Sequence, residues 1–467
     1  MKIYDDKHYN PRRKQMIRLS IAIAIAAAAI LFYIFAPQFE SEPPKAALIS
    51  EPFWNGDLEL DLKITDNRAI AKYEIALLDT IEADAKEIKI ASGDGEGRNE
   101  IALKIKMPDK APLPKKRAAL IARISDASWK NFGDGNFAEV KIDIEMDRRA
   151  PIVNIVATSY AISLGGSALA IFEAKDENLK EVSVKTRNGR TFVAAPFHKP
   201  NFYVALIARG IKDTEFTAYA VASDRAGNQN RARLPLYLKD TRYKESVLPL
   251  TKDFMEGKVD DLNFRYNPRY KEISQLEKFI YVNEDLRKES FDLIEKYTAP
   301  SKLPPAENFT IGAFRPLPNS KMVAGFGEHR IFTLEGKNVS ESYHYGVDLA
   351  SVKEANVFAT NGGVAVFAGD NGVYGSMPII HHGLGLFSLY GHCTDLKIAQ
   401  GDNVRNGEII GTTGITGFAL GDHTHFETRV QGVPVSPLEW MDSAWIRANI
   451  TKIEEEARKI IDGRSSN

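Results

Sequence analysis

The feature that most constrains this chain is a run without charge near its beginning, from Leu19 to Ala36. Basic residues dominate the segment before it, namely Lys2, Lys7, Arg12, Arg13, Lys14 and Arg18. A helix that spans a bilayer needs about 20 apolar residues and tolerates about 17, and flanking basic residues stay in the cytoplasm. The sequence therefore predicts a cytoplasmic tail over residues 1–18, a transmembrane helix over 19–36, and an outward-facing remainder.

A cleaved signal peptide is the alternative interpretation of the same run. Pro37 follows the run directly, and no pair of small residues in cleavage-site spacing ends it, so an uncleaved anchor is favoured. Residues 37–45, which include Glu40, Glu42 and Pro43, are expected to form a short polar linker.

Length, composition and charge exclude some classes of protein. The chain has 467 residues, 44% hydrophobic and 26% charged, which is ordinary for several globular domains. A net charge of -1 provides no basic surface for a nucleic acid, so nucleic-acid binding is not expected. Cys393 is the only cysteine, so a disulfide within the chain is excluded. A buried thiol is favoured for it over a metal-ligand or redox role.

Residues 46–240 alternate apolar and polar side chains in short runs, for example over 58–64, 139–144 and 216–221. A weak internal repeat divides them into two predicted β-sandwich modules, 46–147 and 148–240. The turn Asp224–Asn228 resembles the closing turn of bacterial Ig-like modules. Calcium binding by the Asp and Asn residues of these turns is an alternative, although ordinary turn chemistry explains them better.

The pattern becomes helical in the predicted connector, residues 241–305, where apolar residues recur at helical spacing between Glu272 and Lys296. Two roles are open for it: a lid that covers a functional groove, or a packed connector, which is favoured. Many glycines then punctuate short strands over 306–442, which predicts an antiparallel β domain with an open groove. A final helix over 443–467 is expected to pack on that domain, with partner binding as the alternative.

Five potential metal-binding or proton-transferring side chains lie in three short segments of this last β domain: His344, Asp348, His392, His423 and His425. Alternate residues of a strand share a face, so the two residues of each His–Asp or His–His pair should point the same way. The same rule places Tyr390 and His392 on one face of their segment. Two histidines and one carboxylate would leave a fourth zinc position open, as in a catalytic site. The two remaining histidines could transfer protons.

The set resembles the lysostaphin-type, LytM-like zinc metallopeptidases, which carry an HxxxD pair, a Tyr-x-His and an HxH pair. The resemblance spans roughly Phe314 to Trp445, with further agreement at Phe326–Arg330, Gly411–Gly414 and Gly432–Pro437. It implies that His344, Asp348 and His425 are zinc ligands and that His392 and His423 are the catalytic imidazoles.

The resemblance also implies a function: zinc-dependent hydrolysis of peptide cross-links in cell-wall peptidoglycan, with zinc polarising the scissile carbonyl and lowering the pKa of its water toward ~7. The expected fold is mainly β, with two Ig-like β-sandwich modules, a helical connector and an antiparallel β LytM-like peptidase domain. The expected partners are peptidoglycan stem peptides, the inner membrane through one helix, and a regulatory protein. The peptidase would face the periplasm. The alternative is a non-hydrolytic scaffold that activates a separate wall hydrolase.

Overall fold

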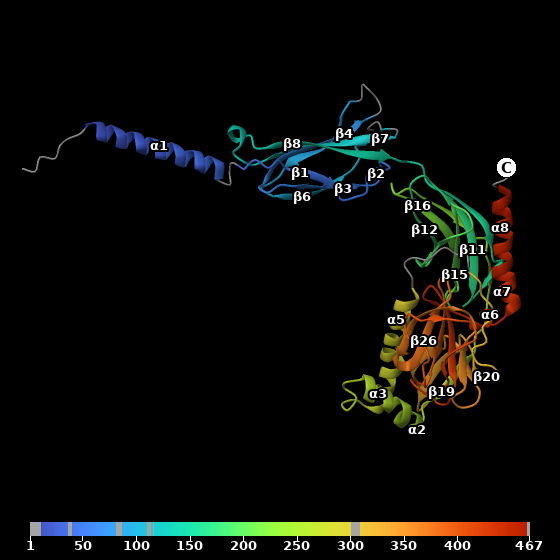
Figure 1. The fold of residues 1–467 in the computed structure, drawn as a ribbon. Coiled ribbons are helices and arrows are strands. Elements are labelled where there is room, and N and C mark those ends of the chain that lie inside the picture. The colour runs from blue at the N-terminus through green and yellow to red at the C-terminus, as the bar shows by residue number, and fades with distance from the viewer. Residues whose placement is uncertain are drawn as a thin grey trace, which may run out of the picture. The chain divides into compact units, whose positions relative to one another are not determined.

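The computed structural model of this chain describes residues 11–35, 40–80, 86–109, 114, 116–299 and 309–464. The described residues are mostly β-strands in antiparallel sheets, so the predicted fold class is confirmed at that level (Figure 1). The chain forms two compact units. Unit 1 comprises Met1–Ala150 with Asp224–Asn228, and unit 2 comprises Pro151–Ser223 with Gln229–Asn467.

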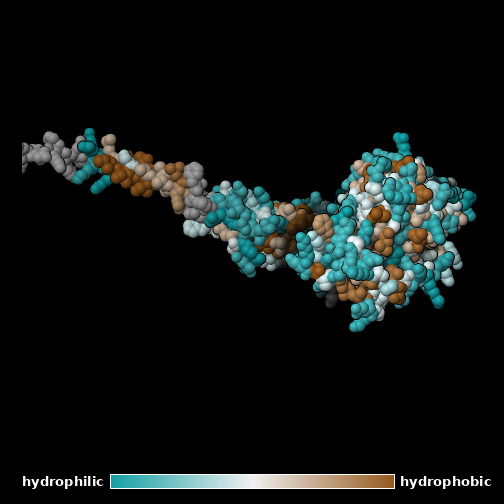
Figure 2. Space-filling model, turned by 90° about the horizontal axis from the view of Figure 1, so that it is seen from below, coloured by the Kyte–Doolittle hydropathy of each residue, from teal (hydrophilic) through white to brown (hydrophobic). Residues whose placement is uncertain are grey.

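The first element of unit 1 is the apolar helix α1, Pro11–Phe35. It begins before the apolar run because the Arg and Lys residues that precede that run are themselves good helix formers. Leu19, Ile21 and Ile23 expose more than half of their surfaces, and Figure 2 shows brown side chains along this helix. The segment Arg12–Tyr33 is long and apolar enough to cross a membrane, a test that a signal sequence also passes. Residue 36, the predicted end of the span, lies outside the described residues.

Two sheets and one short 3-10 turn, η2 (Asn131–Gly133), form the rest of unit 1. The smaller sheet, in spatial order, contains β1 (Lys45–Leu48), β3 (Leu60–Thr65) and β6 (Glu100–Ile105). The larger sheet contains β2 (Phe53–Trp54), β8 (Phe137–Met146), β7 (Arg117–Asp126), β4 (Ile70–Asp79) and β5 (Ile88–Asp94). Leu60, Leu62 and Ile64 are buried on one face of β3, which confirms the alternation expected there.

Unit 2 begins with a pair of four-stranded sheets and a short parallel pair. One sheet contains β14 (Ala195–Pro196), β15 (Phe202–Ala208), β11 (Ser167–Lys175) and β9 (Ile152–Thr158). The other contains β13 (Thr191–Val193), β12 (Leu179–Thr186), β16 (Ala218–Asp224) and β17 (Gln229–Arg233). The parallel pair is β10 (Ala161–Ser163) with β18 (Tyr237–Lys239).

The later part of unit 2 is built on one long antiparallel sheet. Its strands, in order, are β20 (Lys321–Ala324), β23 (Val347–Ala350), β30 (Thr424–Val430), β27 (Leu386–Gly391), β26 (Ser376–His381), β25 (Gly363–Asp370) and β28 (Asn403–Val404), with β31 (Val433–Val435) also on β30. A separate pair is β24 (Asn356–Ala359) with β29 (Glu408–Thr412), and the short turn η5 covers Gly372–Tyr374. Many buried apolar residues of the long sheet, among them Val347, Ile380 and Phe426, belong to the same core cluster as those of the preceding sheets, so these parts of unit 2 have a common core.

The predicted helical connector starts with a strand instead. β19 (Glu245–Pro249) pairs in parallel with β21 (His329–Leu334), which pairs with β22 (Lys337–Tyr343). Ser246 and Leu248 alternate with Glu245 and Val247 along that strand, a period of two that the helical interpretation of residues 243–297 missed. The helices follow: α2 (Lys252–Phe254), η3 (Met255–Val259), α3 (Asp260–Tyr266), α4 (Gln275–Ile280), η4 (Tyr281–Leu286) and α5 (Arg287–Thr298). Residues 300–305 lie outside the described residues.

These helices are packed against the long sheet. Phe279, Val282, Leu286 and Ile294 are buried in one cluster with side chains of β26 and β27. Figure 1 shows α5 lying along that sheet beside β26. The packing agrees with the connector interpretation, although β19 and α2 also line the pocket described below.

The chain ends in α6 (Pro437–Trp440), α7 (Ser443–Ile446), η6 (Arg447–Thr451) and α8 (Lys452–Arg464). α8 contacts β9 and β11, so the expectation that the final helix packs on the 306–442 region is corrected. The spacing of the apolar residues from Trp445 to Ala457 predicts Ile460 on the buried face, yet Ile461 is buried and Ile460 is 40% exposed. The π-helical turn η6 explains the shift, because its wider turn advances the buried face.

Candidate metal centre

Strand pairing brings the predicted site residues together. Asp348 on β23 lies opposite His425 on β30, and Gly391 at the end of β27 lies opposite the same His425. His344 precedes β23, and His423 immediately precedes β30. The neighbouring order β23, β30, β27 therefore delivers three distant sequence segments to one place.

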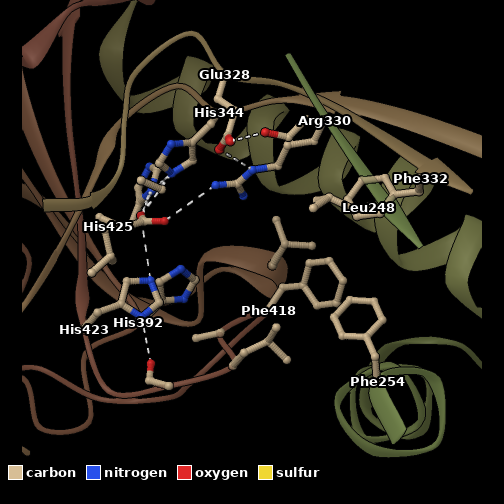
Figure 3. A pocket seen from close by; sticks show the side chains of 18 of the residues that line it. Leu248, Phe254, Glu328, Arg330, Phe332, His344, His392, Phe418, His423 and His425 are labelled. Carbon is tan, nitrogen blue, oxygen red and sulfur yellow. Dashed lines mark hydrogen bonds and ion pairs between the residues drawn. The ribbon is translucent and has the colours of Figure 1, made fainter. Parts of the chain in front are cut away.

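Three of these residues form a tight triangle of donor atoms (Figure 3). The distances are 3.0 Å from His344 Nε2 to Asp348 Oδ1, 3.0 Å from His344 Nε2 to His425 Nδ1, and 3.0 Å from His425 Nδ1 to Asp348 Oδ1. Zinc bonds of about 2.0–2.2 Å at tetrahedral angles place neighbouring donor atoms about 3.3 Å apart. The triangle is close to that size, and all three residues are buried.

The outer nitrogen of each imidazole is anchored in a way that turns a lone pair inward. His344 Nδ1 lies 2.8 Å from the carbonyl oxygen of Gly325, so it donates and leaves Nε2 as an acceptor. His425 Nε2 lies 3.3 Å from Glu427 Oε2, so it donates and leaves Nδ1 as an acceptor. Two nitrogen lone pairs and a carboxylate oxygen then converge, an arrangement that repels itself unless a proton or cation lies among them. The donor set therefore fits a metal ion.

The electrostatics of the triangle are dominated by Asp348. Burial raises the pKa of this carboxyl group, but His344 and His425 outweigh burial and hold it well below its usual value. Burial lowers the pKa of His344 despite Asp348. Burial also acts to lower the pKa of His425, but its hydrogen bonds to Asp348 and Glu427 raise that pKa to about 9. A metal ion that binds here must displace the proton from His425.

Gly346 explains why the His344–Asp348 segment can approach β30 so closely. A Cβ atom at this position would lie 2.6 Å from Nε2 of His425 and 2.5 Å from the carbonyl oxygen of Phe426. Any larger residue would displace the imidazole that completes the triangle. The close approach of the two segments therefore requires a residue without a side chain at this position.

The other two histidines lie beside the triangle and face each other. The rings of His392 and His423 are 4.8 Å apart, and His423 Nε2 is 3.7 Å from Asp348 Oδ1. Each Nδ1 is anchored on a backbone carbonyl, that of Thr416 at 2.8 Å for His392 and that of Gly421 at 2.7 Å for His423. Both Nε2 atoms are thereby left as acceptors. Burial lowers the pKa of His392 to about 3.

The alternation rule fails at His392, which does not share the face of Tyr390. Tyr390 packs against Phe426, whereas His392 packs against His425. His425 precedes Phe426 on β30, so the two lie on opposite faces of that strand. The reason is local: β27 ends at Gly391, and His392 has a φ of 64°, so its side chain leaves the strand pattern.

A buried charge network behind His425 was not predicted as functional. Glu427 accepts from His425, from the hydroxyl of Tyr374 at 3.0 Å and from Arg429 Nε at 2.6 Å. The guanidinium of Arg429 lies over the ring of Phe291 on α5, 4.2 Å from its centroid. Glu427 is two residues after His425, so strand alternation places both on one face and could have identified it.

Three further histidines of this region and Cys393 lie outside the triangle. His329 stacks on Tyr343, and His382 bonds to Gly362 and Ser388. His381 stacks on Phe387. Cys393 is buried, and burial raises the pKa of its thiol to about 12, in agreement with a non-reactive packed cysteine.

The triangle and the histidine pair line one side of a pocket of about 720 Å³. Figure 3 shows His344, His392, His423 and His425 on one side, with Leu248, Phe254, Phe332 and Phe418 on the other. Between them lie two charged side chains, Arg330 on β21 and Glu328 immediately before that strand. Apart from Phe418, the far wall comes from β19, α2 and β21, elements that precede the HxxxD, Tyr-x-His and HxH segments.

Comparison with known proteins assigns this region to a family. Residues 342–437 match peptidase family M23. A DD-carboxypeptidase/endopeptidase, Mpg, of Neisseria meningitidis serogroup B is 43% identical over 95 residues, which are 20% of this chain and 22% of that protein. The murein hydrolase activator NlpD of Salmonella dublin is 30% identical over 146 residues, 31% of this chain and 35% of that protein.

The C-terminal region of the chain therefore carries an M23 peptidase domain of the LytM type, as the motifs predicted. The similarity is confined to that region: the chain spans about a fifth of the length of the first of these relatives. Among solved structures, a putative M23 peptidase from Pseudomonas aeruginosa aligns with a TM-score of 0.38 at 16% identity, covering 62% of this chain and 97% of that one.

Proposed function

We propose that the M23 domain of this chain is a zinc-dependent endopeptidase that hydrolyses peptide cross-links of cell-wall peptidoglycan. The observation that carries the proposal is the triangle of His344, Asp348 and His425, whose three inward-facing donor atoms suit an ion and leave the pocket side open. A protein site of two histidines and one carboxylate with an open position is typical of catalytic zinc.

When bound, zinc would supply Lewis-acid activation of the scissile carbonyl and of a water molecule. The remaining chemistry is assigned to the chain's own residues. His423 and His392 present acceptor Nε2 atoms on the open side, so one can take the proton of the attacking water and return a proton to the leaving amine. The buried Glu427 holds His425 in the orientation that keeps Nδ1 in the triangle.

The proposed location follows from α1 and from the substrate. If α1 remains uncleaved, it anchors the chain in the inner membrane, and the basic residues at its start stay cytoplasmic. The sheets of both units and the pocket then face the periplasm, where stem peptides are the substrate and a regulatory protein is a candidate partner.

The proposal is tested by digesting purified peptidoglycan with the full chain in detergent, with and without a zinc chelator. We expect cross-linked dimers to be converted to monomers, the chelator to stop the conversion, and added zinc to restore it. The fragments that disappear identify the bond. Conversion that continues at full rate in the chelated protein would overturn the zinc assignment.

A second candidate function is non-hydrolytic activation of a separate wall hydrolase, because one similar protein is a murein hydrolase activator. The same digestion distinguishes the two. Folded, zinc-loaded chain that leaves every cross-link intact, yet accelerates an added wall hydrolase, would support activation and overturn the endopeptidase proposal.

A further inference from the structure

Arg330 places a cationic group inside the pocket, next to the metal triangle. Its side chain, on β21, is 26% exposed. Its Nε donates to Glu328 Oε2 at 3.0 Å, and its Nη2 lies 3.8 Å from Asp348 Oδ2. Figure 3 shows the guanidinium between the histidines and the apolar side chains of Leu248 and Phe332.

Glu328 holds the guanidinium of Arg330 in place but shares its negative charge with a second cation. Glu328 also accepts from Ser246 at 2.6 Å and pairs with Lys244 at 3.0 Å, so its single charge is shared between two cations. Burial raises the pKa of Glu328, but the bonds to Ser246, Lys244 and Arg330 outweigh it and lower that pKa to about 2. Glu328 is therefore ionised at neutral pH and acts as a permanent anchor for Arg330.

Three cations, Lys244, Arg287 and Arg330, and three carboxylates, Glu328, Asp348 and Asp422, line the pocket. Burial lowers the pKa of Arg287 to about 10, and the charge of Arg330 contributes to the decrease. Arg287, which also lines the pocket, is still protonated at neutral pH. Asp422 is bound to Thr413 and to the backbone N–H of Glu354. The remaining carboxylate, Asp348, belongs to the metal triangle. A cation bound in the triangle would take up the charge of Asp348, so that Arg330 could pair with one further anion.

We infer that Arg330 binds a free carboxylate on the leaving side of the scissile amide, an inference that rests on the proposed endopeptidase function. A carboxyl group on the carbon that bears the scissile nitrogen is three bonds from the scissile carbon, within about 4 Å. A cation that holds it must therefore lie beside the metal position, as Arg330 does. Guanidinium groups recognise carboxylates with two parallel hydrogen bonds.

This subsite selects a chemical class of cross-link. It fits a terminal D-amino acid or a diamino dicarboxylic acid whose second amine is attached to a carboxyl-bearing carbon, since both carry a free carboxylate beside the scissile nitrogen. It does not fit a polyglycine bridge, where that carboxyl is itself an amide. Arg330 and Glu328 precede the segment 342–437 that matches the family, so the selecting group comes from outside the matched segment.

The first test uses the unaltered full chain and two synthetic cross-linked peptides, with the carboxyl group beside the scissile nitrogen either free or amidated. Both carry a ketomethylene group in place of the scissile amide, and their dissociation constants are measured by calorimetry. Because a hydrogen-bonded charge is worth about 1.5–3 kcal/mol, the free acid should bind at least about tenfold more tightly. Equal affinities would overturn the inference.

The cleavable forms of the same peptides separate this inference from the proposed function. Preferential binding of the free acid without cleavage would retain the subsite and count against the endopeptidase. Cleavage of both peptides at equal kcat/KM, with equal binding, would retain the endopeptidase and remove the subsite.

Variants then assign the preference to Arg330. R330Q should abolish the preference for the free acid and leave binding of the amidated peptide within about twofold. R330K should keep part of the preference, because lysine retains the charge but cannot donate two parallel hydrogen bonds. R405Q, at an exposed arginine outside the pocket lining, is the matched control and should behave as the parent chain. Zinc content is measured in each. If R330Q loses zinc or weakens both peptides equally, Arg330 only orients Asp348 and the inference fails.

Discussion

The metal triangle and the histidine pair are neighbours of similar composition, yet they are held in different ways. In the triangle, the imidazoles of His344 and His425 both meet the carboxylate of Asp348, and His425 is supported from behind by Glu427. In the pair, His392 and His423 are each anchored on one backbone carbonyl, and neither has a side-chain carboxylate within 3.5 Å among the described residues.

The difference indicates a division of roles. Converging lone pairs with negative charge around them favour a cation, and buried partners fix the geometry that an ion requires. A carbonyl anchor fixes only the tautomer and leaves Nε2 free to gain and lose a proton without disturbing neighbours. The following predictions test that division, beginning with the largest expected effect.

Asp348→Ala should remove both zinc and activity. The carboxylate contacts both histidines of the triangle, so its loss leaves two ligands and no negative charge. We expect zinc affinity to fall by more than the roughly 100-fold that follows loss of an outer partner. Metal analysis after dialysis, together with peptidoglycan digestion, measures it. Retention of stoichiometric zinc would show that the triangle is not the metal site.

His423→Ala should keep zinc and lose turnover by about 10²- to 10⁴-fold, the usual contribution of a proton-transfer group. His329→Ala, at a histidine that stacks on Tyr343 away from the pocket, is the control and should retain activity. If His423→Ala loses as much zinc as Asp348→Ala, the division between triangle and pair is wrong.

Glu427→Gln should weaken zinc binding by about 10- to 100-fold while the protein remains folded, because the amide still accepts from His425 but no longer provides charge. Competition with a zinc-binding dye measures the affinity, and circular dichroism checks the fold. Unchanged affinity would limit Glu427 to a structural partner of Arg429.

A second buried glutamate provides the contrast to Glu427. Glu439 accepts from the backbone N–H of Ser167 at 2.9 Å, and burial raises its pKa to about 7. Because its pKa in the unfolded chain is lower, about 4.5, the free energy of unfolding should fall as pH rises from about 4.5 to 7. Glu439→Gln should flatten this slope and stabilise the protein at pH 8 by about 1–3 kcal/mol. Denaturant titrations at pH 5 and 8 measure it, and equal slopes in both proteins would contradict the assignment.

The sequence predicted the candidate site better than its surroundings. The motif indicated that His344 and Asp348 belong to one site, but strand alternation does not explain their contact. His344 lies between β22 and β23, and residues four apart on one strand would be about 13 Å apart. Strand alternation also failed at His392, where the strand ends one residue early and φ becomes positive. No periodicity signals the end of a strand at a Gly–His pair.

The far wall of the pocket was beyond sequence reasoning for a different reason. β19 lies about 80 residues before its partner β21, and a pairing over that distance leaves no local pattern. Arg330 stood in a recognised motif, but its position beside Asp348 depends on how β21 crosses the pocket. The packing of α8 on β9 and β11 was missed likewise, because an amphipathic helix indicates a buried face and not its partner.

The common core of unit 2 bears on how parts of this chain could be exchanged between proteins. Gln431, one residue past β30, donates to the backbone of Val193 and accepts from it, and the ring of Trp440 donates to Ser167. If residues 342–437 were moved alone, the contacts of Gln431 with Val193 would be lost and apolar side chains of the common core would be exposed on both pieces. An exchangeable unit that keeps these contacts would run from Pro151 to the last helix, so that the paired sheets and the M23 domain would have to move together.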